Sequence, residues 1–265
     1  MINITSYLVK KLRLRTGIGI MDCKQALINS KGDFEQAIIY LRKHGKITAL
    51  KKNANIAARG VVSTYLKDNF GYMIELNCET DFVSRHIEFI NFAKNILIQS
   101  HLQQLKDLEW LRTVFEEDRI SLISKFNENI IIRRFCFLEG NTILSYDHIG
   151  RVGVLLNAQS CDKEVLKYIA MHIAASRPEY IDVSDIPKEI VHQEREIQLE
   201  IALKTGKNKE IAQKIVHGRI NKFINRISLL EQDFIIDPTK KVKTVLNENN
   251  IKILKFFRFE VGENI

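Results

Sequence analysis

The N-terminal part of the chain repeats apolar residues at helical spacing and is broken by short turns that contain glycine. Leu8 and Leu12 share one face of the first segment, TGIG at 16–19 interrupts it, and the helical pattern then resumes. Asp33 precedes a third apolar stripe as a typical helix N-cap, and Gly45 follows it as a typical C-cap. This pattern predicts a compact three-helix bundle followed by a polar connector.

The middle of the chain alternates between strand-like and helical patterns. The predicted strands are residues 61–66, 71–78, 131–140 and 151–159, and the predicted helices are residues 86–99, 101–125 and 163–180. The order of a strand followed by a helix at 72–98 is echoed at 152–175. This echo predicts a duplicated α+β unit with antiparallel sheets.

Residues 188–227 have a different pattern, in which isoleucines recur along narrow seams on both sides of the polar turn KTGKNK. Two antiparallel helices fit this pattern, and they either protrude as a coiled-coil hairpin or lie flat on the core. The narrow seams favour protrusion. The tail predicts a short helix and then a strand in which Phe257, Phe259 and Val261 alternate with polar residues.

Together these patterns predict an α+β protein with three parts. Residues 1–54 form a three-helix bundle of the ubiquitin-associated kind, and residues 55–140 form a first core subdomain. Residues 141–265 form a second core subdomain, into which the helical hairpin at 188–227 is inserted.

The formal net charge of +8 is concentrated in one region of the chain. Residues 1–60 hold twelve Lys and Arg against three Asp and Glu, a charge of +9, whereas residues 61–265 sum to −1. A basic module of this size suits RNA or an acidic protein surface equally well. The charge does not extend along the chain as a phosphate-binding groove requires, so a docking patch is the simpler interpretation.

Motifs for catalysis, cofactor binding and membrane insertion are missing from the sequence. There is no GxxxxGK[ST] and no HExxH, and Gly17 and Gly19 lie between helices rather than at a strand-to-helix turn. No apolar run approaches the roughly 18 residues of a membrane helix, and the N-terminus lacks the features of a secretory signal. We therefore expect a cytoplasmic protein that is not an enzyme and needs no cofactor.

The cysteines favour reduced thiols rather than a metal site. Cys23, Cys78, Cys136 and Cys161 are far apart, without a CxxC motif. A pairing of Cys161 with His172 is conceivable, but core packing is the better interpretation of both residues.

The stretch CETDFVSR at 78–85 places a large aromatic residue in a turn between acids and a base. Thr80 or Asp81 fits the N-cap of a short helix that begins near Val83. Phe82 then either folds back on that helix as a hydrophobic staple or contacts another protein. The residues alone leave both alternatives open.

Several stretches, in this order along the chain, resemble one family. They are LRLRTGIGIMDCKQAL at 12–27, GDFEQAIIYLRKHG at 32–45, NCETDFVSR at 77–85, IGRVGVLL at 149–156 and HIAASRPEYI at 172–181. In sequence and spacing they resemble bacterial elongation factor Ts, the nucleotide exchange factor of the translational GTPase elongation factor Tu. The resemblance covers almost the whole chain.

The resemblance implies which residues contact the partner. In the family, the N-terminal module docks on the G domain, and the TDFV turn is pushed between G-domain helices near the magnesium site. The implied docking residues are Arg13, Gly17, Gly19, Met21, Asp22 and Lys24. The implied wedge residues are Thr80, Asp81, Phe82 and Val83, together with His148 in a loop before the strand RVGVLL.

The resemblance also implies a mechanism without bond chemistry. Such a protein binds elongation factor Tu in its GDP form, distorts the magnesium and phosphate site, releases GDP and holds the nucleotide-free state until GTP binds. Stable nucleic-acid binding and membrane association are not expected. The alternative is a basic RNA-binding protein, whose salt-sensitive binding would be lost without residues 1–60.

Family members commonly continue past the final FEVG strand with a helical piece that folds back on the G domain, whereas this sequence ends at Ile265. Either that contact is missing or the sequence is shortened, and we expect a weaker complex.

Overall fold

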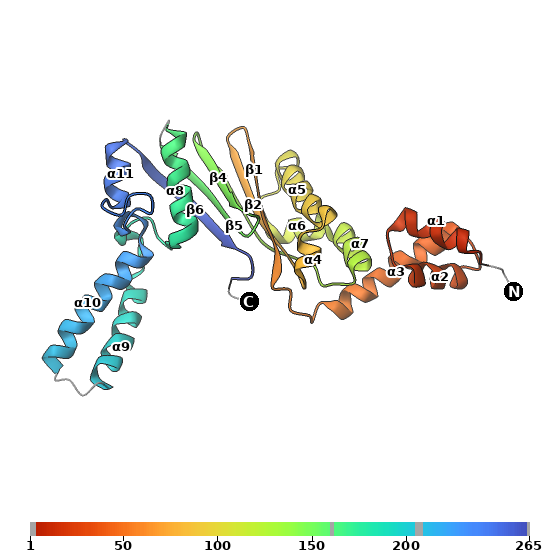
Figure 1. Cartoon of the computed structure of the whole chain (residues 1–265), viewed down its shortest axis with the longest axis horizontal. Coiled ribbons are helices and arrows are strands. Elements are labelled where there is room, and N and C mark those ends of the chain that lie inside the picture. Colours follow the sequence, from red (N-terminus) through yellow and green to blue (C-terminus); the bar gives the residue numbers. More distant parts are fainter. Residues whose placement is uncertain (1–3, 160–161, 205–208, 264–265) are drawn as a thin grey trace.

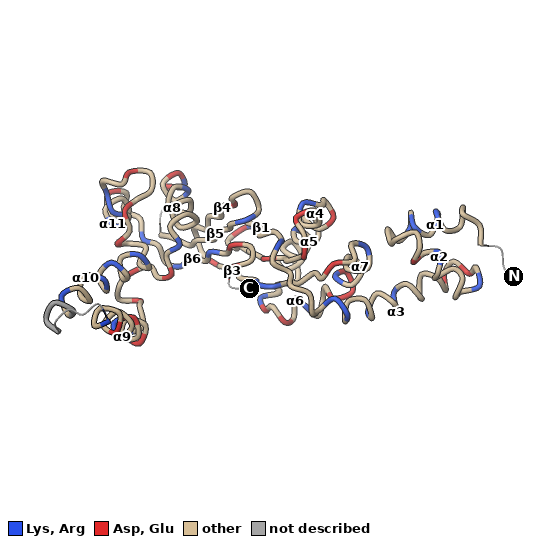
Figure 2. The backbone as a smooth tube through the Cα atoms, turned by 60° about the horizontal axis from the view of Figure 1, so that its bottom comes forward, with Lys and Arg blue, Asp and Glu red and all other residues tan. Residues whose placement is uncertain are grey.

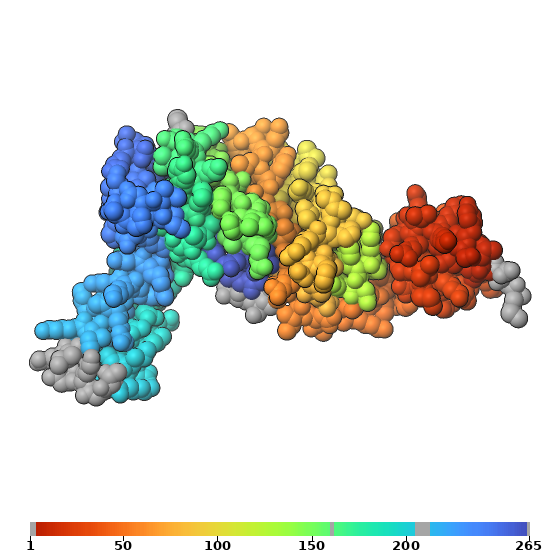
Figure 3. Space-filling model, in the orientation of Figure 1, coloured from red at the N-terminus to blue at the C-terminus, as the bar shows by residue number. Residues whose placement is uncertain are grey.

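The computed structural model describes residues 4–159, 162–204 and 209–263. The molecule is elongated, with a helical bundle at one end, two β-sheets side by side in the middle and a helical hairpin projecting from the other end (Figures 1 and 3). The predicted α+β class is confirmed. In the described part of the chain, no helix combines the length and the apolar character needed to cross a membrane.

The bundle consists of α1 (Ser6–Thr16), α2 (Ile20–Asn29) and α3 (Phe34–Lys52). Thr5 caps α1, and the Asp33 carboxylate caps α3 by accepting a hydrogen bond from the Gln36 N–H at 2.9 Å. Small and branched side chains fill the space between the helices: Val9, Leu12, Cys23, Ala26, Leu27, Ala37 and Leu41. The bundle is therefore a small hydrophobic core of its own.

The prediction that Gly45 ends the third helix is wrong, because α3 continues through it to Lys52. Gly45 is buried, and a Cβ atom added there would lie 2.4 Å from Ser124 Oγ and 3.2 Å from Ile120 Cγ2. Both neighbours belong to α7 (Glu116–Phe126). Glycine costs about 1 kcal/mol inside a helix, and here it permits close packing of α3 on α7 instead of ending the helix.

Two three-stranded antiparallel sheets form the middle of the molecule. The first contains β1 (Arg59–Lys67), β2 (Phe70–Cys78) and β3 (Ile131–Glu139), in that order. The second contains β4 (Ile143–His148), β5 (Val152–Gln159) and β6 (Lys252–Glu260), in that order. In each sheet a hairpin is followed by helices, and the chain returns to the other side of the middle strand. The strand-then-helix order predicted at both places is present.

Helices cover the outer face of each sheet. The first sheet packs against α5 (Ile87–Leu102), α6 (Leu108–Val114) and α7, and the second packs against α8 (Lys163–Ser176) and α11 (Val242–Glu248) (Figure 1). Helices on the outer faces leave the inner faces of the two sheets free to pack on each other. The core between them is formed by Val62, Met73, Cys136, Leu138, Leu155, Phe259 and Val261.

A buried carboxylate also joins the two sheets. Glu75 of β2 is fully buried, and it pairs with Arg133 Nη1 at 2.9 Å and Arg134 Nε at 2.6 Å. Its carboxylate also accepts a hydrogen bond from the N–H of Gly262, directly after β6, at 3.0 Å. A buried charge needs such partners, and here they tie the C-terminal turn to the first sheet.

The hairpin consists of α9 (Lys188–Lys204) and α10 (Lys209–Ile227), and it projects from the second sheet (Figures 1 and 3). Short helical turns flank it, η1 (Val183–Asp185) and η2 (Leu229–Glu231). Its seam is narrow, with Ala202, Val216 and Ile220 as buried contacts. The two helices pack on each other and extend away from the core.

Candidate functional site

The segment after β2 exposes an aromatic side chain. Thr80 has extended backbone, and its side-chain oxygen accepts a hydrogen bond from the Val83 N–H at 3.5 Å, which makes it the N-cap of α4 (Asp81–Ser84). The predicted cap is therefore present at Thr80. Val83 is buried in the core of the first sheet, whereas Phe82 is 84% exposed. Phe82 does not fold back on the helix.

Asp81, beside Phe82, has a weak partner. Its carboxylate lies 3.6 Å from Arg85 Nη2, and the two side chains are 55% and 83% exposed. Exposed pairs of this kind contribute little to stability. Asp81 can therefore give up Arg85 for a donor on another molecule at small cost.

His148 lies at the end of a strand. The expectation that it sits in a loop is wrong, because it is the last residue of β4 and pairs with Val152 of β5. In the sequence ILSYDH, apolar and polar residues alternate over residues 144–147 alone, the shortest run that indicates a strand, and this strand was missed. The His148 ring is exposed, and its Nδ1 atom lies 3.1 Å from the Tyr146 hydroxyl.

The two predicted contact points lie at the same end of the paired sheets, Phe82 in α4 after β2 and His148 at the end of β4. The Gly150 carbonyl, in the turn after His148, accepts a hydrogen bond from the Val62 N–H of β1 at 2.8 Å. This end of β1 pairs with the end of β2 that leads into α4, with Arg59 opposite Cys78. The structure therefore brings together residues that lie far apart in the sequence.

The predicted docking residues of the bundle surround the turn between α1 and α2. Gly17 has a φ of +71° and donates its N–H to the Arg13 carbonyl at 2.7 Å, a C-cap that favours glycine. Gly19 is the N-cap of α2. The remaining predicted residues, Arg13, Met21, Asp22 and Lys24, are all exposed. Lys and Arg are spread along α1 and α3 rather than gathered in one block (Figure 2).

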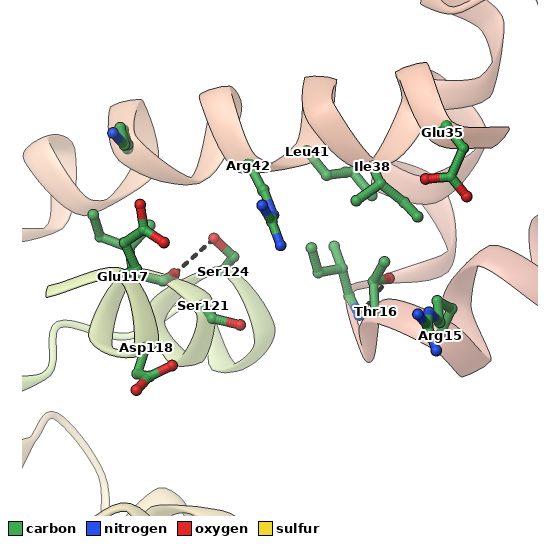
Figure 4. Close-up of a pocket in the computed structure, with 13 residues that line it drawn as sticks. Arg15, Thr16, Glu35, Ile38, Leu41, Arg42, Glu117, Asp118, Ser121 and Ser124 are labelled. Carbon is green, nitrogen blue, oxygen red and sulfur yellow. Dashed lines mark hydrogen bonds between the residues drawn. The ribbon is translucent and has the colours of Figure 1, made fainter. Parts of the chain in front are cut away.

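A cleft of about 430 Å³ lies between the bundle and α7, beside the direct contact of α3 with α7. Cationic side chains of the bundle, Arg15, Arg42 and Lys46, line it together with the acidic Glu117 and Asp118. Figure 4 shows Arg42 reaching from α3 into this space, beside Ser121 and Ser124. None of the partner-binding residues expected from the sequence lines this cleft, so it marks the junction between bundle and core rather than the predicted site.

Two ionisable groups next to the exposed turn, Cys78 and Glu79, have shifted pKa values. Burial raises the pKa of the Cys78 thiol to about 12, with Glu128 adding to the shift, and its Sγ donates to the Thr80 carbonyl at 3.1 Å. Burial also acts to raise the pKa of Glu79, but hydrogen bonds from Asn129 and Asn55 outweigh it and lower that pKa. Cys78 therefore remains a neutral thiol and Glu79 a carboxylate.

His172 is a core residue. Its Nε2 lies 2.8 Å from Gln232 Oε1, and its Nδ1 accepts a hydrogen bond from the Ile235 N–H at 3.2 Å. Burial lowers its pKa, although the Gln232 bond opposes the shift. Cys161, its conceivable metal partner, lies outside the described residues. Among the residues that are described, no three His, Cys, Asp or Glu gather as metal ligands.

Sequence reasoning missed two features of this surface. Glu128 accepts a hydrogen bond from the Thr80 N–H, and Glu79 accepts one from the Asn129 N–H. These partners lie about fifty residues apart, so local patterns do not reveal them. Ile149, next to His148, is 83% exposed and has a φ of +54°, which is unusual for a β-branched residue. The glycine at position 150, directly after Ile149, was the available signal for a tight turn.

An exposed aromatic residue on a firmly held turn, with a second exposed face on the bundle, is the arrangement of a protein that acts through contacts with another macromolecule. The family described as Elongation factor TS matches residues 79–263. The chain is 48% identical to elongation factor Ts of Serratia proteamaculans over 265 residues, which are 100% of this chain and 94% of the relative. It is 47% identical to the Klebsiella pneumoniae (strain 342) protein and 48% identical to that of Escherichia coli (strain ATCC 8739), with the same shares covered. The chain belongs to the elongation factor Ts family.

Proposed function

We propose that this chain is the guanine nucleotide exchange factor of the translational GTPase elongation factor Tu. Membership of the elongation factor Ts family supports the proposal. The observation that carries it is Phe82, a large apolar side chain that is 84% exposed although Thr80 and Val83, on either side of it, are held in place. A side chain of this kind gains most from a pocket on another protein.

In this proposal each element of the surface has a role. The bundle docks on the G domain through the residues around the α1–α2 turn. Asp81 and Phe82 enter between G-domain helices near the bound magnesium ion, while Thr80 and Val83 hold the short helix that carries them. His148, at the same end of the sheets, presses toward the phosphate-binding loop. The chain binds the GDP form, and GDP leaves as the magnesium and phosphate site is distorted.

Exchange in this scheme is a matter of linked binding equilibria. A protein that binds the nucleotide-free GTPase more tightly than the GDP form weakens GDP binding by the same factor. The chain makes and breaks no bond. It then holds the nucleotide-free state until GTP binds.

Several contacts must act together to reach the required energy. A ten-thousandfold preference for one state corresponds to about 5.5 kcal/mol. Burial of one Phe side chain supplies about 1.5–3 kcal/mol. Further contacts are therefore needed, and exposed Ile235 and Ile236, on the second half of the core, are suitable for the third domain of elongation factor Tu.

The test of the proposed function is release of fluorescent GDP from elongation factor Tu, with this chain in substoichiometric amounts. We expect faster release with turnover, and a nucleotide-free complex that survives nuclease treatment. A folded chain that leaves the release rate unchanged would overturn the proposal. Loss of the complex on nuclease treatment would favour RNA binding instead.

The first variant to measure is Phe82→Ala. Because the wedge contributes about 1.5–3 kcal/mol, we expect the exchange rate to fall about tenfold to a hundredfold, with no loss of stability. The matched control is Trp110→Ala, which removes another exposed aromatic side chain, 59% exposed, from α6. Equal effects of both substitutions would show that Phe82 has no special role.

A further inference from the structure

The Glu128 carboxylate, in the loop between α7 and β3, holds the start of the exposed turn. Its Oε2 accepts hydrogen bonds from the N–H groups of Glu79 at 3.1 Å and Thr80 at 3.0 Å. Its Oε1 accepts a third hydrogen bond from the Thr80 hydroxyl at 2.6 Å. Hydrogen bonds to a charged acceptor are stronger than neutral ones, so this is a firm attachment of one loop to another.

The attachment is reciprocal. The Glu79 Oε1 atom accepts hydrogen bonds from the Asn129 N–H at 2.7 Å and from the Asn55 side chain at 2.9 Å. The buried Asn129 side chain in turn donates to the Asn55 carbonyl at 2.8 Å. Each loop thus supplies a carboxylate to the backbone of the other, and the segment that leaves α3 is included in the same network.

Glu128 also decides how the Thr80 hydroxyl is used. A hydroxyl has one proton to donate, and at Thr80 that proton goes to Glu128 Oε1. The Thr80 oxygen is then left as an acceptor for the Val83 N–H, which is the bond that caps α4. Loss of the Glu128 acceptor would free the hydroxyl to rotate away from the cap.

The short helix depends on such attachments. α4 has four residues, and an isolated turn of this length is unstable in water. Phe82 itself is exposed and makes no contribution to holding the helix, so Thr80 and Val83 set its direction. A binding group gains affinity and rate when its free conformation already matches the bound one.

We propose that Glu128 is a positioning residue for Phe82: its carboxylate fixes Thr80 and thereby holds the exposed ring in the direction needed for exchange. The inference rests on the proposed exchange function. Glu128 itself need not touch the partner. It acts through Thr80, because a fixed Thr80 keeps the Phe82 ring mainly in one orientation.

The test is the substitution Glu128→Gln, which keeps the size of the side chain but replaces one acceptor oxygen by an NH₂ group. The release rate of fluorescent GDP is measured against the concentration of the variant. We expect the maximal rate to fall about tenfold and the half-saturating concentration to change little, because the bundle still docks. The matched control is Glu117→Gln, an exposed glutamate of α7, which should match the unsubstituted chain.

A double substitution separates positioning from a general structural role. If Glu128 acts through Phe82, Glu128→Gln should slow exchange no further in a Phe82→Ala background. A full additional tenfold loss in that background would overturn the inference, as would a Glu128→Gln rate equal to that of the unsubstituted chain. If Glu128→Gln fails to fold, Thr80→Val carries the same test, since it removes the hydroxyl that Glu128 accepts from. Failure of the proposed function is distinct, because the unsubstituted chain would then show no exchange.

Discussion

At the scale of single residues, neighbours in the proposed exchange surface around α4 differ sharply in burial. Val83 is buried in the first sheet's core while Phe82, one position earlier, is exposed. Thr80 uses its hydroxyl both to donate and to accept. In the core, His172 likewise uses both ring nitrogens for hydrogen bonds, to the Gln232 side chain and the Ile235 N–H. Thr80 and His172 each bind a backbone N–H group, of Val83 and of Ile235, and so link a side chain to the local backbone.

His172 makes stability depend on pH. Burial lowers its pKa from the ordinary value of 6.5, so the folded chain keeps the imidazole neutral where the unfolded chain takes up a proton. This contribution is fully present above pH 6.5 and is lost as the pH falls below that value. We expect the urea midpoint to drop between pH 7 and pH 5, roughly the range in which an unperturbed histidine titrates.

The control for this prediction is His172→Gln, which cannot take up a proton. The lowered carboxylate pKa values at Glu79, Asp182, Asp237 and Glu260 start from 3.8 to 4.5, so they act at lower pH. The variant should therefore be less stable at pH 7 and show a flatter profile down to about pH 5. An unchanged slope would assign the pH dependence to other groups.

At the scale of elements, the close approach of the two sheets depends on a glycine in each. A Cβ atom added at Gly71 would lie 2.6 Å from Leu155 Cδ1, and one added at Gly153 would lie 2.5 Å from Val62 Cγ1. The inner strands therefore pack with almost no space between them. This contact and the hydrogen bonds of Glu75 together set the position of one sheet on the other.

The substitution Gly153→Ala should push the sheets apart. Its Cβ would lie 2.5 Å from Val62 Cγ1 and 2.8 Å from the Met73 sulfur. We therefore expect a loss of about 1–3 kcal/mol in the free energy of unfolding. Urea unfolding measures it. The matched control is Gly218→Ala in α10, where nothing lies within 4 Å of the added atom. That change should raise stability by about 0.5–1 kcal/mol, and a similar gain at Gly153 would contradict the tight packing.

Elements whose signals are local could be predicted from the sequence, whereas those set by distant partners could not. The Asp33 cap and the bundle core follow from residues within one or two turns. Gly45 lies inside a helix because α7, far along the chain, packs on it. The strand that ends at His148 was missed because its sides face similar surroundings. At the site, the Thr80 cap could be predicted from its neighbours, but the exposure of Phe82 was left open by them, and the loop that holds Thr80 was not predicted.

At the scale of the whole molecule, the parts differ in how firmly they are held. α8 carries a row of buried side chains, Leu166, Ile169, Ala170, His172, Ile173 and Ala174, whereas α9 has Ala202 as its buried residue. Local opening follows the density of buried contacts. The hairpin is therefore expected to open without unfolding the sheets.

Native-state hydrogen exchange measures this difference. Backbone amides of α9 should exchange on the order of a hundredfold faster than those of α8. The amides of α8 serve as the internal control, since both helices are read from the same sample. Equal protection of the two helices would show that the hairpin unfolds together with the core.

The unbroken course of α3 through Gly45 has a consequence for affinity. With 19 residues the helix is about 28 Å long, and it packs on α7 as it enters the core. In the proposed function, the bundle and the Phe82 turn are two binding modules, and α3 joins them as a stiff spacer instead of a flexible linker. Once one module has bound, the other meets its target at a high effective concentration, but only on a partner whose two sites match this spacing. The same helix therefore raises avidity for the right GTPase conformation and lowers it for others.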